Sequence, residues 1–100
     1  MKRTKFYIAV YNSEKHAQDA QQVEGYFEFV AGLPLGFHKS DGAWTCSELS
    51  TGCAITYGRT RAEALEKARP YFDRVCKMIL DEKMQPVRRM ITAAYNGGAA

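Results

Sequence analysis

Thiols and imidazoles are the side chains of this chain that could serve as nucleophiles, bases or metal ligands. The 100 residues include three cysteines and two histidines. No two cysteines form a C-x-x-C pair, and His16 and His38 are far apart, so the spacing disfavours a zinc site. Cys46 and Cys53 fall on the inward faces of predicted strands with no histidine nearby, which predicts buried thiols instead of a nucleophile. The sequence therefore predicts a protein that is not an enzyme and holds neither metal nor cofactor.

The cysteines also bear on the compartment. Their number is odd, and the plain interpretation is that Cys46, Cys53 and Cys76 are reduced thiols buried as small apolar side chains. A disulfide between Cys46 and Cys53 across one turn is the alternative. The basic N-terminus leads into an alternating pattern unlike that of a secretory signal, and no apolar run approaches the roughly 20 residues that span a bilayer. We expect a cytoplasmic protein with no membrane partner.

Carboxylates form no evident acid–base pair. Most of the 11 acidic residues fall on polar helix faces beside basic residues, as Glu63 does four residues before Lys67. Glu48 is the exception, because it lies on the inward side of a predicted strand. We expect its side chain to be exposed at the strand end, with pairing to Arg59 or Arg61 as the alternative. No glycine-rich phosphate loop stands between a strand and a helix.

The composition is that of one folded domain with an ordinary charge. Hydrophobic residues make up 46% and aromatic residues 12% of the chain, enough for a core that offsets the loss of chain entropy. The net charge of +3 permits contact with nucleic acid without arguing for it. We therefore expect a single domain over residues 1–100, with a core in residues 1–83 and a tail helix and frayed end in residues 84–100.

The first third of the chain predicts a strand followed by a helix. Residues 5–11 alternate apolar and aromatic side chains with period two, which is typical of a strand. Ser13 is placed to cap a helix that runs from Glu14 with apolar residues every three or four positions. Gly32 and Pro34 would end it. The alternative is that Gly25 breaks the helix and residues 26–31 form a strand.

The middle of the chain predicts a three-stranded meander. Turn residues at 40–42 and 50–52 separate strands at 35–39, 43–49 and 53–57. One face is expected to be buried and the other wet, as is usual in an antiparallel sheet. The inward set is Trp44, Cys46, Cys53, Ile55 and Tyr57; the wet set is Thr45, Ser47, Ala54 and Thr56.

Two helices are predicted after the meander. Thr60 and Glu63 form a capping box for a helix that continues to about Lys83, either kinked at Pro70 or broken just before it. Pro86 opens a shorter amphipathic helix, and residues 97–100 are expected to fray. The predicted class is α+β: a small antiparallel sheet in the order β-α-β-β-β-α with the helices on one face, then a short C-terminal amphipathic helix.

Two resemblances bear on function. The α-β-β-β-α order of residues 14–83, with GRTRAEALEKA before the second helix, resembles the double-stranded-RNA-binding domain. The segment WTCSELSTGC, followed by the same GRTRAEALEKA, is similar to the sheet-to-helix core of HicB-type antitoxins. The first resemblance implies shape recognition of duplex RNA. The second implies a small, non-enzymatic, partner-binding fold of bacteria and their mobile elements.

We therefore expect an interaction protein that binds and inhibits or regulates a bacterial protein or ribonucleoprotein. It would be antitoxin-like, or a phage-encoded inhibitor of a defence complex of the anti-CRISPR kind. A weak nucleic-acid-binding module is the alternative, and a homodimer is open. Aromatic and arginine side chains carry most interface energy. On this basis the candidate partner-binding residues are Tyr7, Tyr11, His38, Arg59, Arg61, Arg88 and Arg89.

Overall fold

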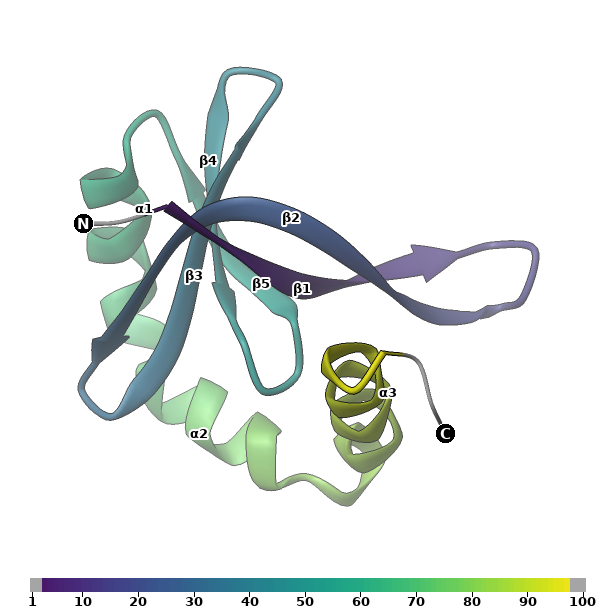
Figure 1. The fold of residues 1–100 in the computed structure, drawn as a ribbon. Helices are drawn as coiled ribbons and strands as arrows, with labels where there is room; N and C mark the ends of the chain where they lie inside the picture. The colour runs from purple at the N-terminus through teal and green to yellow at the C-terminus, as the bar shows by residue number, and fades with distance from the viewer. Residues whose placement is uncertain (1–2, 98–100) are drawn as a thin grey trace.

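Five consecutive strands precede all of the helices in the computed structural model, which describes residues 3–97 (Figure 1). The strands are β1 (Arg3–Asn12), β2 (Ala17–Val30), β3 (Leu33–Ser40), β4 (Ala43–Glu48) and β5 (Cys53–Gly58). Each pairs antiparallel with the next, so the sheet order is β1-β2-β3-β4-β5. The helices are α1 (Arg61–Ala68), α2 (Phe72–Leu80) and α3 (Gln85–Tyr95), with 3-10 turns at Arg69–Tyr71 and Glu82–Met84. The class is α+β, but the predicted order of strands and helices is wrong.

The predicted helix from Glu14 is the long strand β2. The turn between β1 and β2 is held by the side chain of Asn12, not by Ser13. Its Oδ1 accepts hydrogen bonds from the backbone N–H of Glu14 (3.0 Å) and Lys15 (3.4 Å). His16 then takes a left-handed conformation, with φ of 52°, that reverses the chain. β2 pairs with β1 on one side and β3 on the other, a gain that helical propensity does not offset. The alternative strand at residues 26–31 was therefore closer to the structure.

The meander is confirmed, but a β-bulge changes which residues of β5 face inward. Cys46 is opposite Thr56 and Ser47 is opposite Ala54, so Ile55 is the extra residue. Thr56 consequently shares a face with Cys46 and is buried, while Tyr57 is 60% exposed. The Thr56 hydroxyl donates a hydrogen bond of 2.6 Å to the carbonyl of Ala64 in α1. The predicted orientations of Thr56 and Tyr57 are thus wrong.

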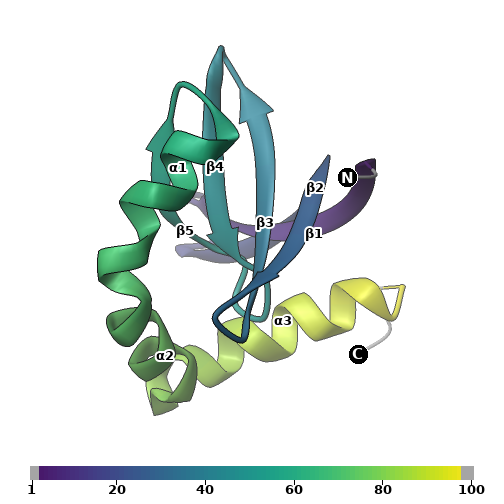
Figure 2. The same cartoon turned by 90° about the vertical axis from the view of Figure 1, so that its left-hand side faces the viewer.

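Helices α1 and α2 cover one face of the sheet (Figure 2). The Thr60 hydroxyl accepts the N–H of Glu63 at 3.0 Å, which confirms the predicted helix start. Gly58 lets α1 approach closely, because a Cβ there would lie 2.6 Å from the backbone nitrogen of Ala64. The helix breaks at the 3-10 turn that contains Pro70. The buried core on this face comprises Leu33, Leu35, Phe37, Cys46, Ala64, Ala68 and Val75.

The opposite face of β4 is also buried, because β1 folds across it. The Ala9 N–H donates to the carbonyl of Gly52 at 2.8 Å, which joins the outer edge of β1 to the β4–β5 turn. Thr45 and Ser47, predicted to be wet, are 8% and 1% exposed. Ile91 of α3 is buried and approaches Gly52.

Helix α3 coincides with the predicted tail helix. It contacts β1 and β2, outside the core under α1 and α2, so the helices do not all share one face (Figure 2). Of the end predicted to fray, Gly97 is described and residues 98–100 lie outside the described residues.

Glu48 holds the β4–β5 turn from inside the protein. Its carboxylate is fully buried and accepts four hydrogen bonds. Oε2 accepts the N–H of Ser50 (2.7 Å), and Oε1 accepts the hydroxyl of Ser50 (2.8 Å) and the N–H (2.9 Å) and hydroxyl (3.0 Å) of Thr51. Both predictions for Glu48, exposure or pairing with an arginine, are wrong. Local hydrogen bonds to the turn satisfy the charge instead.

We predict that Glu48→Gln destabilises the protein by about 2–3 kcal/mol. The amide nitrogen of glutamine would take the place of Oε2 and face the N–H of Ser50, so two hydrogen-bond donors would meet without an acceptor. Urea unfolding measures the change. Glu24→Gln is the matched control, since Glu24 makes only an exposed ion pair with Arg3 (3.4 Å) and should cost less than about 0.5 kcal/mol. Equal unfolding midpoints for the two variants would contradict the role of Glu48.

Candidate functional site

The residues predicted to bind a partner do not form one surface. They are distributed over β1 and β3 (Tyr7, Tyr11, His38), the start of α1 (Arg59, Arg61) and α3 (Arg88, Arg89). Helices α1 and α3 lie well apart in both views of the fold (Figures 1 and 2). One partner is therefore not expected to contact all seven of these residues through a single interface.

The predicted exposed face of Tyr7, Tyr11 and His38 is present only in part. Tyr11 is 62% exposed. Tyr7 is half-buried: its N–H donates to the hydroxyl of Tyr95 at 3.0 Å, and the two rings meet edge to face at 5.0 Å. His38 is buried, with its ring 6.3 Å from that of Phe6 in an edge arrangement. Exposure of Tyr7 and His38 was wrong because β1 and α3 cover them.

Two of the four candidate arginines have contacts within the fold. Arg61 lies over the ring of Tyr26, with the guanidinium carbon 4.4 Å from the ring centre, a cation–π contact. Arg88 donates through Nη1 to the carbonyl of Ile79 at 3.2 Å, which ties α3 to the end of α2. Arg59 and Arg89 are exposed. The arginines thus join secondary-structure elements as well as presenting charge.

The cysteines are all free. Burial raises the pKa of Cys46 to about 12, so its thiol is protonated at neutral pH and is a poor nucleophile. Cys53 is half-buried. Cys76 is exposed, which corrects the prediction that all three are buried. Among residues 3–97, no three His, Cys, Asp or Glu side chains are grouped as metal ligands would be.

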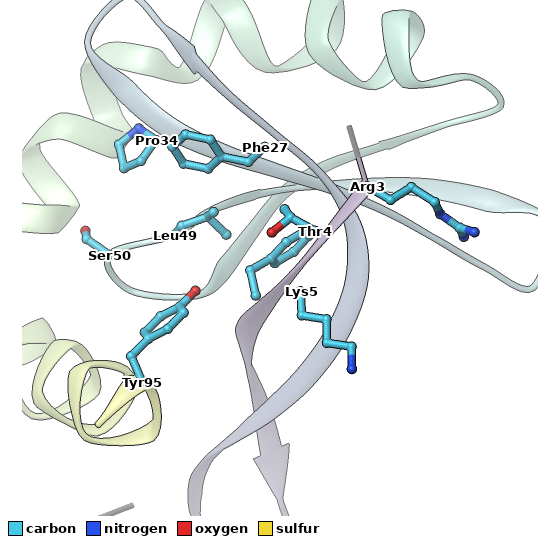
Figure 3. Close-up of a pocket in the computed structure, with 9 residues that line it drawn as sticks. Arg3, Thr4, Lys5, Phe27, Pro34, Leu49, Ser50 and Tyr95 are labelled. Atoms are coloured by element: carbon cyan, nitrogen blue, oxygen red, sulfur yellow. The ribbon is translucent and has the colours of Figure 1, made fainter. Parts of the chain in front are cut away.

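A large apolar groove lies beside the outer edge of β1 (Figure 3). Its volume is about 710 Å³, within the usual range for binding pockets. We call it the β1 groove. Its lining residues are Arg3, Thr4, Lys5, Phe6, Phe27, Pro34, Leu49, Ser50 and Tyr95.

The β1 groove is assembled from five parts of the fold, including Pro34 of β3. Thr4 and Phe6 come from the start of β1, Phe27 from β2 and Leu49 from the turn that Glu48 holds. Tyr95 closes one end from α3 (Figure 3). No lining residue is a histidine, cysteine or carboxylate, and most of the lining surface is apolar, so the groove chiefly offers contact area.

Exposed aromatic rings extend the β1 groove onto the surface. Phe27 is 37% exposed and Phe29 is 67% exposed, and their rings meet edge to face at 4.8 Å. Tyr95 at the other end is 51% exposed. Exposed rings around an apolar hollow are typical of a protein-binding surface. Sequence reasoning missed these residues because it placed Phe27 and Phe29 in a helix, although their alternation with Glu28 is the period of a strand.

A second, more polar cavity lies where β1 crosses β3 and β4. Its volume is about 360 Å³. The Nδ1 atom of His38 is buried there without a hydrogen-bond partner in the described part of the chain. Thr45 and Ser47 line the cavity, as does Asp41. Desolvation by burial lowers the pKa of His38 from its ordinary value of 6.5, so the ring is neutral in the folded protein at pH 7.

Comparison with known proteins identifies no relative. No family model matches the chain, and no curated protein or solved structure matches it at a significant level. Within residues 3–97, none of the helices has the length and apolar character needed to cross a membrane.

We predict that His38 makes the protein less stable in acid. Because its folded pKa lies below 6.5, the unfolded state binds a proton first as the pH falls, and stability declines below about pH 7. The slope contributed by one such group reaches at most about 1.4 kcal/mol per pH unit. Urea unfolding between pH 7.5 and 5 should show that His38→Gln flattens this slope. The exposed His16 provides the control, and a flattened slope in His16→Gln instead would contradict the prediction.

Proposed function

We propose that this protein is a non-catalytic interaction protein that binds a segment of another protein in the β1 groove. The observation that carries the proposal is the groove itself: an apolar hollow of about 710 Å³, rimmed by exposed aromatic rings and lined by no histidine, cysteine or carboxylate. Large apolar and aromatic surfaces of this kind supply the central contacts of protein interfaces. A segment of a partner that places one large side chain in the groove would bury Phe27 and Tyr95 together.

Binding of this kind suits an inhibitor or regulator. A protein of 100 residues that occupies a segment of its partner can block that partner without chemistry of its own. The similarity to HicB-type antitoxins, and the small non-catalytic fold, support an antitoxin-like role or that of a phage-encoded inhibitor of a bacterial defence complex, acting in the cytoplasm. The β-meander core and the helix that begins after Thr60 carry the antitoxin similarity. In the double-stranded-RNA-binding resemblance, by contrast, β2 stands where that domain has its first helix.

The start of α1 carries the alternative, nucleic-acid-binding function. Arg59 is exposed there, and Lys67 and Arg69 are exposed further along. Two of these charges are offset by ion pairs: Glu63 pairs with Lys67 at 3.4 Å, and Glu66 pairs with Arg69 at 3.0 Å. Binding to duplex RNA or DNA that weakens steeply as salt rises from about 50 mM would support this alternative.

We predict that Phe27→Ser combined with Phe29→Ser weakens partner binding at least about 30-fold, since truncated interface hot spots cost about 2 kcal/mol or more. Both rings are exposed, so the fold should persist. The partner would be captured from the native host, identified by mass spectrometry, purified, and titrated against wild type and variants by calorimetry.

Leu80→Ser is the matched control, because Leu80 is 79% exposed on α2, outside the β1 groove. Arg59→Ala with Arg61→Ala tests the surface predicted from the sequence. If the phenylalanine variant binds the purified partner as wild type does, the groove is not the binding site.

A further inference from the structure

The two edges of the sheet are protected to different degrees. At the β5 edge, Lys67 of α1 donates to the carbonyl of Tyr57 at 3.2 Å, so a helix side chain occupies the edge. At the β1 edge, the N–H of Tyr7 donates to the Tyr95 hydroxyl (3.0 Å) and that of Ala9 to the Gly52 carbonyl (2.8 Å). The middle of β1 is therefore satisfied. An unpaired strand edge is a template for another strand.

The start of β1 has no such cover among the described residues. The N–H groups of Tyr7 and Ala9 point away from β2, and the pairing of β1 with β2 runs in register without a bulge. In an antiparallel pair, alternate residues direct their N–H and C=O groups to the same side. Lys5, and Arg3 before it, therefore direct theirs away from β2, toward the side on which the β1 groove lies.

We infer that the β1 groove binds an extended segment of the partner that adds to the sheet as a strand along Arg3–Lys5 and alternates acidic with apolar residues. The inference rests on the proposed function and specifies the chemistry of the bound segment. Backbone hydrogen bonds to the edge would supply affinity, and the groove would select alternate side chains, as in other strand-addition complexes.

The alternation of side chains along β1 determines the pattern of acidic and apolar residues that we expect in the bound segment. Arg3 and Lys5 are exposed and extend away from the groove, whereas Thr4 projects toward it (Figure 3). Side chains of an added strand alternate in the same way. The residue opposite Lys5 would be acidic, because opposite charges across a strand pair are stabilising. Arg3 adds to this preference only in part, because it already pairs with Glu24 of β2 at 3.4 Å. The residue between those opposite Arg3 and Lys5 would project into the apolar groove, toward Phe27 and Leu49.

Charge also selects a partner of this chemistry over a second copy of the chain. An antiparallel pairing of two β1 strands centred on Thr4 places Arg3 opposite Lys5 of the other copy. A pairing centred on Lys5 places the two copies of Lys5 opposite each other. Like charges directly across a strand pair are destabilising. With a net charge of +3, the whole chain also favours an acidic segment.

The test uses a blocked nine-residue peptide that alternates glutamate with leucine, titrated into the ¹⁵N-labelled full chain. Binding should shift the amide signals of Lys5, Leu49 and Tyr95 and slow hydrogen exchange at the Lys5 amide. Lys5→Pro removes the Lys5 charge and the edge-facing N–H, which is not part of the β1–β2 pairing, so that pairing should persist. Lys5→Ala removes the same charge and keeps the N–H. We expect Lys5→Pro to bind roughly fivefold or more weakly than Lys5→Ala, the effect of one lost backbone hydrogen bond.

The outcomes separate this inference from the proposed function. Equal affinity of Lys5→Pro and Lys5→Ala, with binding lost in the Phe27→Ser/Phe29→Ser variant, means groove binding without strand addition; it overturns this inference and leaves the proposed function standing. Equal binding of a lysine–leucine peptide overturns the acidic preference. No binding of the glutamate–leucine peptide up to millimolar concentration, or a dimer of the chain that Lys5→Pro dissociates, also overturns the inference. A capture experiment in which the phenylalanine variant keeps its partner overturns the proposed function itself.

Discussion

The hydrogen bonds of one buried carboxylate hold the turn at which β1 meets the far end of the sheet. Glu48 satisfies its charge with the N–H and hydroxyl groups of Ser50 and Thr51, which holds the β4–β5 turn in one conformation. That turn presents the carbonyl of Gly52 to the N–H of Ala9. A side chain at Gly52 would collide with β1 and with Ile91, so the approach requires glycine, which also tolerates its φ of 71°. The hydrogen bonds of Glu48 are local, but the turn that they hold contacts a strand that is distant in sequence.

This closure explains why a five-stranded meander buries both faces of its fourth strand. An open antiparallel sheet covered by helices on one side leaves its other face wet. Here β1 crosses that face, and α3 supports β1 through Tyr95. His38, Thr45 and Ser47 are buried as a result, although small polar residues are more typical of a solvated face. The crossing buries His38, whose Nδ1 has no hydrogen-bond partner among residues 3–97, and this burial lowers the pKa of the ring.

The sequence predicts those parts of the fold whose signals are local. The turns at 40–42 and 50–52, the Thr60 cap, the break at Pro70 and the helix after Pro86 depend on residues a few positions apart, and all appear in the structure. The state of residues 17–30 depends on two neighbouring strands, so an apolar spacing compatible with a helix misleads. The bulge at Ile55, which reverses the faces of Thr56 and Tyr57, has no local signal. The β1 groove joins five segments and could not be predicted once β2 was taken as a helix.

Incomplete closure of the sheet connects stability with the proposed binding. The bonds from Ala9 and Tyr7 satisfy the middle of β1, and the same two contacts leave the start of the strand beside an apolar hollow. A fully closed barrel would have no such edge, and a fully open one would invite pairing with any strand. The basic side chains of Arg3 and Lys5 allow the edge to stay open for one partner without pairing with every strand. They disfavour pairing between copies of the chain and favour an acidic strand, so one pair of charges both protects the edge and gives it specificity.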